Sequence, residues 1–231
     1  MNQFQRFNHR LRLPFLSTCI VLPLLTSALL LKATPALAHH AMGGGMPSNL
    51  FEGFMSGLAH PVIGIDHLAF IVAIGLLAAI KRHGIWIPIA FVLAAMLGTG
   101  AHLAKFSFPG VELFVSGSIV LVGALLVMKN SPKTGIVTIL AAIAGLFHGY
   151  AYGESIFGAE TTPLVAYLAG FTVIQLVISI TTFWIGHKAT LTRKSEVATA
   201  PFRSAGLVVL GMGVAFFASQ LINVLLPISA A

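Results

Sequence analysis

The segment HPVIGIDHLAF, residues 60–70, combines side chains for metal chemistry with side chains for a membrane. It carries His60, Asp66 and His67, and the next charged residue after it is Lys81. Imidazole and carboxylate together bind divalent transition metals such as Ni²⁺, Co²⁺ and Zn²⁺. Ionisable groups inside membrane segments are costly and usually face a bundle interior or a water-filled path. The segment therefore predicts a cation site within a membrane protein.

The spacing of the two histidines restricts how they bind an ion. On an unbroken helix, His60 and His67 share a face but lie about 10.5 Å apart along the axis, too far for one ion with metal–nitrogen bonds of about 2 Å. Pro61 and Gly64 lie between them and favour a break. The sequence thus leaves two alternatives: two successive sites, or a broken helix that also offers free carbonyls to a cation. The side chains of Asp66 and His67 point about 100° apart around a helix. One can therefore bind the metal ion while the other orients a second ligand residue.

Composition places the chain among integral membrane proteins. Of its 231 residues, 57% are hydrophobic and 8% are charged, whereas soluble domains carry about 25% charged residues. The mean hydropathy is +0.96. A core of this size cannot hide so much apolar surface from water, but runs of about 20 apolar residues can span a bilayer. The net charge of +7 is therefore information about topology and not about nucleic-acid binding.

The first 38 residues have the three parts of a secretory signal peptide. A basic start is followed by an apolar stretch over residues 13–31, and an A-x-A cleavage site ends at Ala38. We expect residues 1–38 to be removed and residues 39–231 to form one permease domain. The alternative is an uncleaved first membrane helix. The single cysteine, Cys19, lies in this segment, so a cleaved chain has neither disulfides nor thiolate ligands.

The predicted fold class is an all-α integral membrane protein, a bundle of six transmembrane helices after the cleaved signal peptide. The six apolar segments lie near residues 62–80, 84–104, 109–128, 133–151, 162–186 and 204–226. Residues 187–203 are predicted to be the one long polar loop. With the mature N-terminus outside, eight Lys and Arg residues lie on the cytoplasmic side and only Lys105 lies outside. We expect a multi-pass protein of a bacterial inner membrane with both mature ends outside the cytoplasm.

On this topology, histidines and acids gather at the outer ends of the first four helices. Any one of them has a plainer interpretation, as a wetted interface group or a helix-packing group, but Asp66 lies several residues inside an apolar span. Tyr150 and Tyr152 are expected to donate hydrogen bonds or to shape the mouth, because neutral tyrosine is a poor ligand. The predicted metal-binding residues are His39, His40, His60, Asp66, His67, Glu112, His148 and Glu154.

These residues resemble the HupE/UreJ family of nickel and cobalt permeases over nearly the whole mature chain. The resemblance rests on His39, on H-P-x-x-G-x-D-H at residues 60–67, on P-G-V-E ending at Glu112, and on H-G-Y-A-Y-G-E at residues 148–154. The family usually has H-G-H-A-H-G-x-E in the last block, so two tyrosines replace histidines and Glu154 comes one residue early. The resemblance implies a six-helix permease that imports Ni²⁺ or Co²⁺ as substrate, with no resident cofactor.

Other functions stay open at this level. Met42 and Met46 accompany His39 and His40, so a copper- or zinc-handling membrane protein is one alternative, and a metal-binding subunit without transport is another. The chain has no H-E-x-x-H motif, which disfavours a metal-dependent hydrolase, so we expect no enzyme. The expected partners are a divalent metal ion and the lipid bilayer, without nucleic acid. The sequence does not determine the energy coupling, the oligomeric state or partners in metalloenzyme maturation.

We predict that the chain is cut after Ala38. The reason is that the A-x-A site follows an apolar stretch interrupted by Pro14 and Pro23. Intact-mass measurement of the protein isolated from membranes is expected to show a chain that begins at His39. A chain that begins at Met1 would contradict the signal peptide and would indicate an additional membrane helix.

Overall fold

The structure is a computed structural model that describes residues 21, 24, 45–192 and 195–226. The predicted cleavage site, His39 and His40 lie outside the described residues. Within the described part, the chain forms helices and no strand. The helices, numbered from α2, are α2 (Leu50–Ile63), α3 (Ile65–Ala79), α4 (Trp86–Leu103), α5 (Val111–Val127), α6 (Thr134–Glu154), α7 (Thr161–Thr192) and α8 (Ser195–Leu225).

Each predicted apolar segment contains a helix, and the first is preceded by the additional helix α2. By length and composition, α4, α6, α7 and α8 can each cross a membrane. α2 and α3 pass the same test only as a pair bent by 78°, and α5 is a shorter apolar helix of 17 residues. The described residues therefore contain four spanning helices, or five with the bent pair counted as one span. The prediction of an all-α membrane protein is confirmed.

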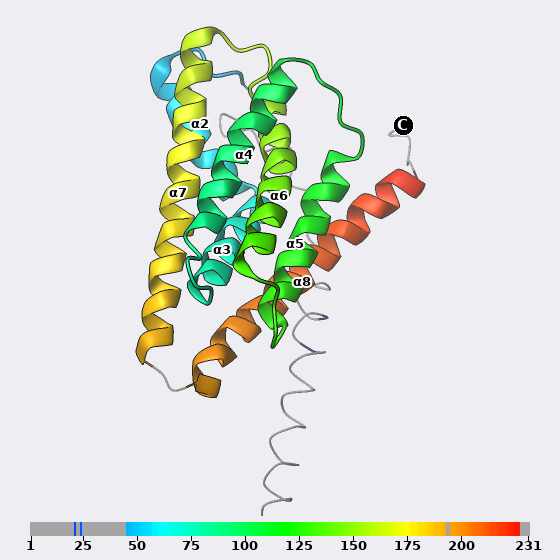
Figure 1. The fold of residues 1–231 in the computed structure, drawn as a ribbon. Coiled ribbons are helices and arrows are strands. Elements are labelled where there is room, and N and C mark those ends of the chain that lie inside the picture. The colour runs from blue at the N-terminus through cyan, green and yellow to red at the C-terminus, as the bar shows by residue number, and fades with distance from the viewer. Residues whose placement is uncertain (1–20, 22–23, 25–44, 193–194, 227–231) are drawn as a thin grey trace, which may run out of the picture.

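Figure 1 shows how the helices pair. α2 lies along α7, α4 lies along α6, and α8 crosses the bundle obliquely against α5. The connections α4–α5 and α6–α7 lie at the same end of the bundle as the beginning of α2. We call this end the outer end and the opposite end the inner end, following the predicted topology. The candidate residues of four helices thus belong to one half of the molecule.

Glycines bring α4 and α6 into backbone contact. A Cβ atom built at Gly98 would lie 2.0 Å from the carbonyl oxygen of Leu146. One built at Gly149 would lie 1.9 Å from the carbonyl oxygen of Ala95. Small residues at helix contacts are usual in membranes, because lipid provides no hydrophobic force between helices and close packing must hold them. This contact fixes the part of α6 that carries His148.

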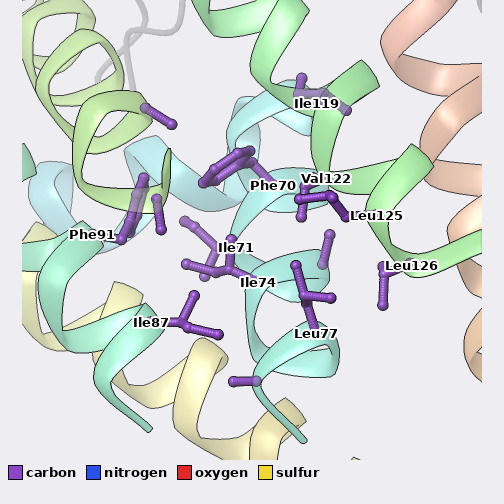
Figure 2. Close-up of a cluster of buried hydrophobic side chains, with 14 of the residues drawn as sticks. Phe70, Ile71, Ile74, Leu77, Ile87, Phe91, Ile119, Val122, Leu125 and Leu126 are labelled. Carbon is purple, nitrogen blue, oxygen red and sulfur yellow. The ribbon is translucent and has the colours of Figure 1, made fainter. Parts of the chain in front are cut away.

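An apolar core fills the interior between α3, α4 and α5 (Figure 2). Its side chains are 7% exposed or less. In a membrane bundle, such side chains contribute through van der Waals packing. The core residues labelled in Figure 2 are Phe70, Ile71, Ile74, Leu77, Ile87, Phe91, Ile119, Val122, Leu125 and Leu126.

The prediction of a long polar loop at residues 187–203 is wrong. α7 continues to Thr192 and α8 begins at Ser195, so helix covers most of the segment. Nine of its 17 residues are Ala, Lys, Arg, Leu or Glu, which are good helix formers, and its one proline, Pro201, is accommodated inside α8. Polar composition marks a segment that leaves the membrane, but it does not determine whether that segment is helical.

Two cationic side chains connect segments at the inner end through hydrogen bonds to backbone carbonyls. Nζ of Lys81 donates to the carbonyl oxygens of Ser131 at 3.2 Å and Pro132 at 2.5 Å, joining the α3–α4 turn to the α5–α6 turn. Partial burial lowers the pKa of Lys81 from its ordinary value. Nε of Arg203 donates to the carbonyl oxygen of Val127 at 3.0 Å and joins α8 to the end of α5.

We predict that Gly98→Ala destabilises the protein by about 1–3 kcal/mol, because the added methyl group overpacks the α4–α6 contact. Gly100→Ala in the same helix is the matched control, since a Cβ atom there meets nothing within 4 Å. It is expected to leave the stability unchanged or to raise it slightly through better helix propensity. Thermal unfolding in detergent, followed by circular dichroism, compares them; equal melting temperatures would contradict the backbone contact.

Candidate metal site

The first apolar segment is broken where Pro61 and Gly64 favour a break. α2 ends at Ile63, α3 begins at Ile65, and the two helices are bent by 78°. Pro61 has no N–H to donate to the carbonyl of Gly57, and Gly64 leaves the helical conformation with φ −70° and ψ 95°. Of the two alternatives that the sequence leaves open, the structure has the broken helix.

The break gathers three imidazole rings inside the bundle. His60 lies in the last turn of α2, His67 in the first turn of α3, and His148 on α6. The ring centres of His60 and His67 are 5.8 Å apart, and those of His67 and His148 are 5.0 Å apart. None of the three side chains is more than 3% exposed. We call them the imidazole cluster.

A chain of hydrogen bonds fixes the protons of His67 and His148. Oγ of Ser118 donates its one hydrogen to the carbonyl of Val115 at 2.6 Å, so it accepts from Nε2 of His148 at 2.9 Å. Nδ1 of the neutral His148 ring is then an acceptor, and the proton on the 2.9 Å contact between the two Nδ1 atoms belongs to His67. Nε2 of His67 therefore carries a lone pair, the form in which imidazole binds metals.

The hydroxyl group of Ser155, which follows α6, holds the ring of His60 by a hydrogen bond, and the hydroxyl group of Tyr167, on α7, holds Ser155 in turn. Oγ of Ser155 lies 3.0 Å from Nδ1 of His60 and 2.9 Å from the hydroxyl of Tyr167. Both hydroxyls also reach the carbonyl oxygen of Tyr152, at 3.0 Å and 3.1 Å. A ring held through one nitrogen has a fixed orientation, as the histidine ligands of metal sites usually do.

Asp66 places a carboxylate at the break. Its Oδ1 accepts from the backbone N–H of His67 at 2.9 Å. The N-cap residue Gly64 has no side chain to cap α3, so the half-buried Asp66 supplies both an acceptor and a negative charge to the positive end of this helix. The result is one carboxylate beside the imidazole cluster, at an interruption in a largely apolar segment.

The two tyrosines that follow His148 have different roles. Tyr150 donates from its hydroxyl to the carbonyl of Phe106 at 2.8 Å, as expected for a hydrogen-bonding residue near the outer end. Tyr152 packs inside the imidazole cluster, with its ring centre 4.4 Å from that of His67 and 5.1 Å from that of His60. It is fully buried, and its hydroxyl has no partner among the described residues. Tyr152 thus shapes the interior of the cluster and not its mouth.

The acids predicted on α5 and α6 lie at the surface of the outer end. Glu112 is in the first turn of α5 and Glu154 is the last residue of α6, and both side chains are exposed. α6 is continuous through Gly149 and Gly153, so Glu154 stays about 9 Å along the helix from His148. Both acids remain outside the imidazole cluster in this structure.

Sequence reasoning missed three hydroxyl residues, Ser118, Ser155 and Tyr167. Their side chains hold the imidazole rings, through the bonds given above. In the part of the chain that the structure describes, other serines and threonines bond only a carbonyl of their own helix, among them Thr172 and Thr182. No sequence signal separates the two groups, because the imidazole partners come from other helices.

The cluster is not a preformed metal site. Among the residues that the structure describes, no three His, Cys, Asp or Glu side chains are arranged to hold one metal ion. The Nδ1–Nδ1 contact of 2.9 Å joins two of the rings directly to each other. An ion bound by three or more of these residues therefore requires side chains to move.

Comparison with known proteins identifies related sequences. The family profile described as HupE / UreJ protein matches residues 27–216, a range that contains every candidate metal-binding residue. The curated relative Protein HupE of Rhizobium leguminosarum bv. viciae is 27% identical over 158 residues, which cover 68% of this chain and 79% of the relative. No solved structure matches the chain.

We predict that His67 and His148 are energetically coupled. Either change to alanine alone leaves a buried ring nitrogen of the partner without its bond, which costs about 1–3 kcal/mol beyond the lost packing. The double variant is therefore expected to lose about 0.5–3 kcal/mol less stability than the sum of the two single variants. Unfolding of the four proteins in detergent measures this difference. The pair His148→Ala with the remote, exposed His83→Asn is the control and should be additive; additive losses for both pairs would contradict the bond.

Proposed function

Because this chain belongs to the HupE/UreJ family, we propose that it imports Ni²⁺ or Co²⁺ across the membrane as a transported substrate. Family membership and the spanning helices support a membrane metal permease in the broad sense. The identity of the ion, the direction of transport and the residues that carry the ion are the proposal.

One observation carries the proposal: the break at Gly64 places imidazole and carboxylate groups together inside a membrane bundle. These are borderline ligands that suit late first-row divalent metals. The carboxylate of Asp66 lowers the cost of holding a divalent cation at membrane depth, which neutral dipoles alone would have to meet. The carbonyls at the end of α2, including that of Gly57 opposite Pro61, add partial negative charge at the same place.

The residues of the site have different roles in this proposal. His67 offers Nε2 to the ion, Asp66 offers its charge, and His60 is the third ligand. His148 bonds His67 through Nδ1 and Ser118 through Nε2, so it orients His67 and becomes a ligand only when that bond opens. Glu112 and Glu154, exposed at the outer end, attract the cation before it reaches the cluster.

An incompletely formed site suits transport. Conduction requires that an ion bind favourably enough to enter but weakly enough to leave. A closed set of three or four ligands would hold Ni²⁺ or Co²⁺ tightly, whereas the imidazole cluster must rearrange to bind and can expel the ion by restoring the 2.9 Å contact between two of its rings. The site is therefore an ion carrier and not a storage site.

The topology in this proposal is six spans, with the bent α2–α3 pair as the first and α5 as the third. The mature ends face outside, in the inner membrane of a bacterium, as the distribution of Lys and Arg predicts. His39 and His40, outside the described residues, would then capture the ion on the outer side. In this topology, Lys81 and Arg203 at the inner end lie on the cytoplasmic side.

We predict that Asp66→Asn abolishes metal uptake in a protein that still folds and inserts. The change keeps the size and an oxygen that can accept the His67 N–H, and it removes the negative charge by replacing the second oxygen with an NH2 group. His67→Ala is expected to lower uptake by a similar factor, and His60→Ala by less if this ring serves mainly the outer side. Uptake of Ni²⁺ and Co²⁺ by cells, with Cu²⁺ and Zn²⁺ compared, is the measurement.

His83→Asn is the matched control for these variants. His83 is an exposed histidine of the inner end with φ 56°, a conformation that asparagine tolerates, so its replacement should leave uptake unchanged. Wild-type uptake by normally expressed Asp66→Asn and His67→Ala would show that the ion passes elsewhere. Both residues would then be helix-packing groups.

A further inference from the structure

Beyond the imidazole cluster, the interior offers an ion few polar contacts. The apolar core begins directly beneath the cluster, with the ring centre of Phe70 4.4 Å from that of His148 and the ring centre of Phe91 5.6 Å from it. From there the core fills the space between α3, α4 and α5 (Figure 2). A divalent cation that crosses such a core without polar partners meets a prohibitive desolvation cost. The inner half of the route must therefore follow polar groups at another interface.

α7 carries polar groups inward from the cluster. Tyr167 and Phe171 belong to the level of the cluster, since the ring centre of Phe171 lies 5.4 Å from that of Tyr152. One turn further along α7 is Gln175, and another turn further is Ser179; both are fully buried. One face of α7 carries these groups. At 100° per residue, an arc of about 80° around the helix contains Phe171, Gln175, Ser179 and Thr182.

Gln175 has an unsatisfied oxygen on this face. Its Nε2 donates to the carbonyl of Phe171 at 3.0 Å, which leaves Oε1 as the other end of the amide. Oε1 is buried and has no hydrogen-bond partner among the described residues. A buried acceptor without a partner costs stability in any protein, and in a membrane bundle no bulk water reaches it. Oε1 of Gln175 is therefore a candidate ligand for a cation that binds there transiently.

The face of α7 that carries Gln175 packs directly on α3. A Cβ atom built at Gly75 would lie 1.9 Å from Oγ1 of Thr182 and 2.5 Å from the carbonyl oxygen of Ser179. Near the inner end, Nδ1 of His187 lies 3.4 Å from the carbonyl oxygen of Ala79. Gly75 is eight residues beyond His67, about 12 Å along α3. The tight contact therefore lies between the cluster and the inner end, just beyond Gln175.

We propose that the ion leaves the imidazole cluster along the α3–α7 interface, where Oε1 of Gln175 is its next ligand and the Gly75–Thr182 contact is a constriction that opens for release. The proposal rests on the proposed metal transport. An amide oxygen is a neutral ligand, weaker for Ni²⁺ and Co²⁺ than imidazole, so the ion passes from a stronger to a weaker contact as it moves inward. Oγ of Ser179 and Oγ1 of Thr182 donate their hydrogens to carbonyls of their own helix, so each hydroxyl oxygen keeps lone pairs that can bind a cation.

The first test separates binding from transport with Gln175→Leu. Ni²⁺ binding to the purified full chain is measured by calorimetry, and Ni²⁺ uptake is measured in proteoliposomes with an entrapped fluorescent chelator. Binding is expected to stay within about threefold of the wild type, while uptake falls at least about tenfold, the effect of losing one desolvated polar contact. Retained binding also shows that the variant is folded. Gln220→Leu on α8 is the matched control and should change neither quantity.

The outcomes of this test are distinct. Uptake by Gln175→Leu at the wild-type rate overturns the proposal, and so does the loss of binding together with uptake, because Gln175 would then belong to the outer site or to the fold. A wild-type protein that neither binds nor transports Ni²⁺ or Co²⁺ would instead refute the proposed function, and the inference with it.

A second test closes the constriction reversibly. In a Cys19→Ser background, Gly75→Cys and Thr182→Cys are combined. A Cβ atom built at Gly75 would lie 3.0 Å from Cβ of Thr182, so a small separation of α3 and α7 brings the pair to the roughly 3.5–4.5 Å of a disulfide. After oxidation with iodine, Ni²⁺ binding is expected to persist while uptake stops, and a reductant should restore it. Each single-cysteine variant controls for the substitutions. Wild-type-like uptake by the fully cross-linked protein would overturn the constriction.

Discussion

A straight helix through residues 50–79 would hold His60 and His67 on one face about 10.5 Å apart along its axis, too far apart for any shared ion. The 78° bend at Gly64 removes this constraint and creates the site. It places the negative end of α2 and the first turn of α3, with Asp66, at the same point inside the bundle. A backbone break at this depth is tolerated because neighbouring helices surround it, as in many transporters.

The cost of unpaired polar groups in a membrane bundle explains much of the arrangement around the break. His148 is satisfied by His67 on one side and Ser118 on the other, and His60 is satisfied through Ser155. These bonds fix the orientation of all three rings, and the tautomers of His67 and His148, without any bound ion. Tyr152 fills the remaining space at the centre of the cluster, with its ring against those of His60 and His67.

The close helix contacts of the bundle differ in what they bring together. The α4–α6 contact at Gly98 and Gly149 is formed between backbones, so the part of α6 that carries His148 is closely packed on α4. The α3–α7 contact at Gly75 meets a threonine hydroxyl as well as backbone, and a side chain yields more readily than a carbonyl. The bent α2–α3 pair is also the one segment of the described bundle interrupted within an apolar run.

The sequence by itself determined the membrane class, the apolar segments and the family, because hydropathy and linear motifs depend on residues that are neighbours in the chain. It also identified Pro61 and Gly64 as the place for a break, since both act through the local backbone. It failed at residues 187–203, where composition does not distinguish helix from loop outside the membrane. Only the tertiary structure decided that His148 meets His67, that Tyr152 enters the cluster and that Glu154 stays outside it. Those relations join different helices or depend on whether α6 unwinds, and they follow from the bend angle and from backbone contacts that no single segment of the sequence contains.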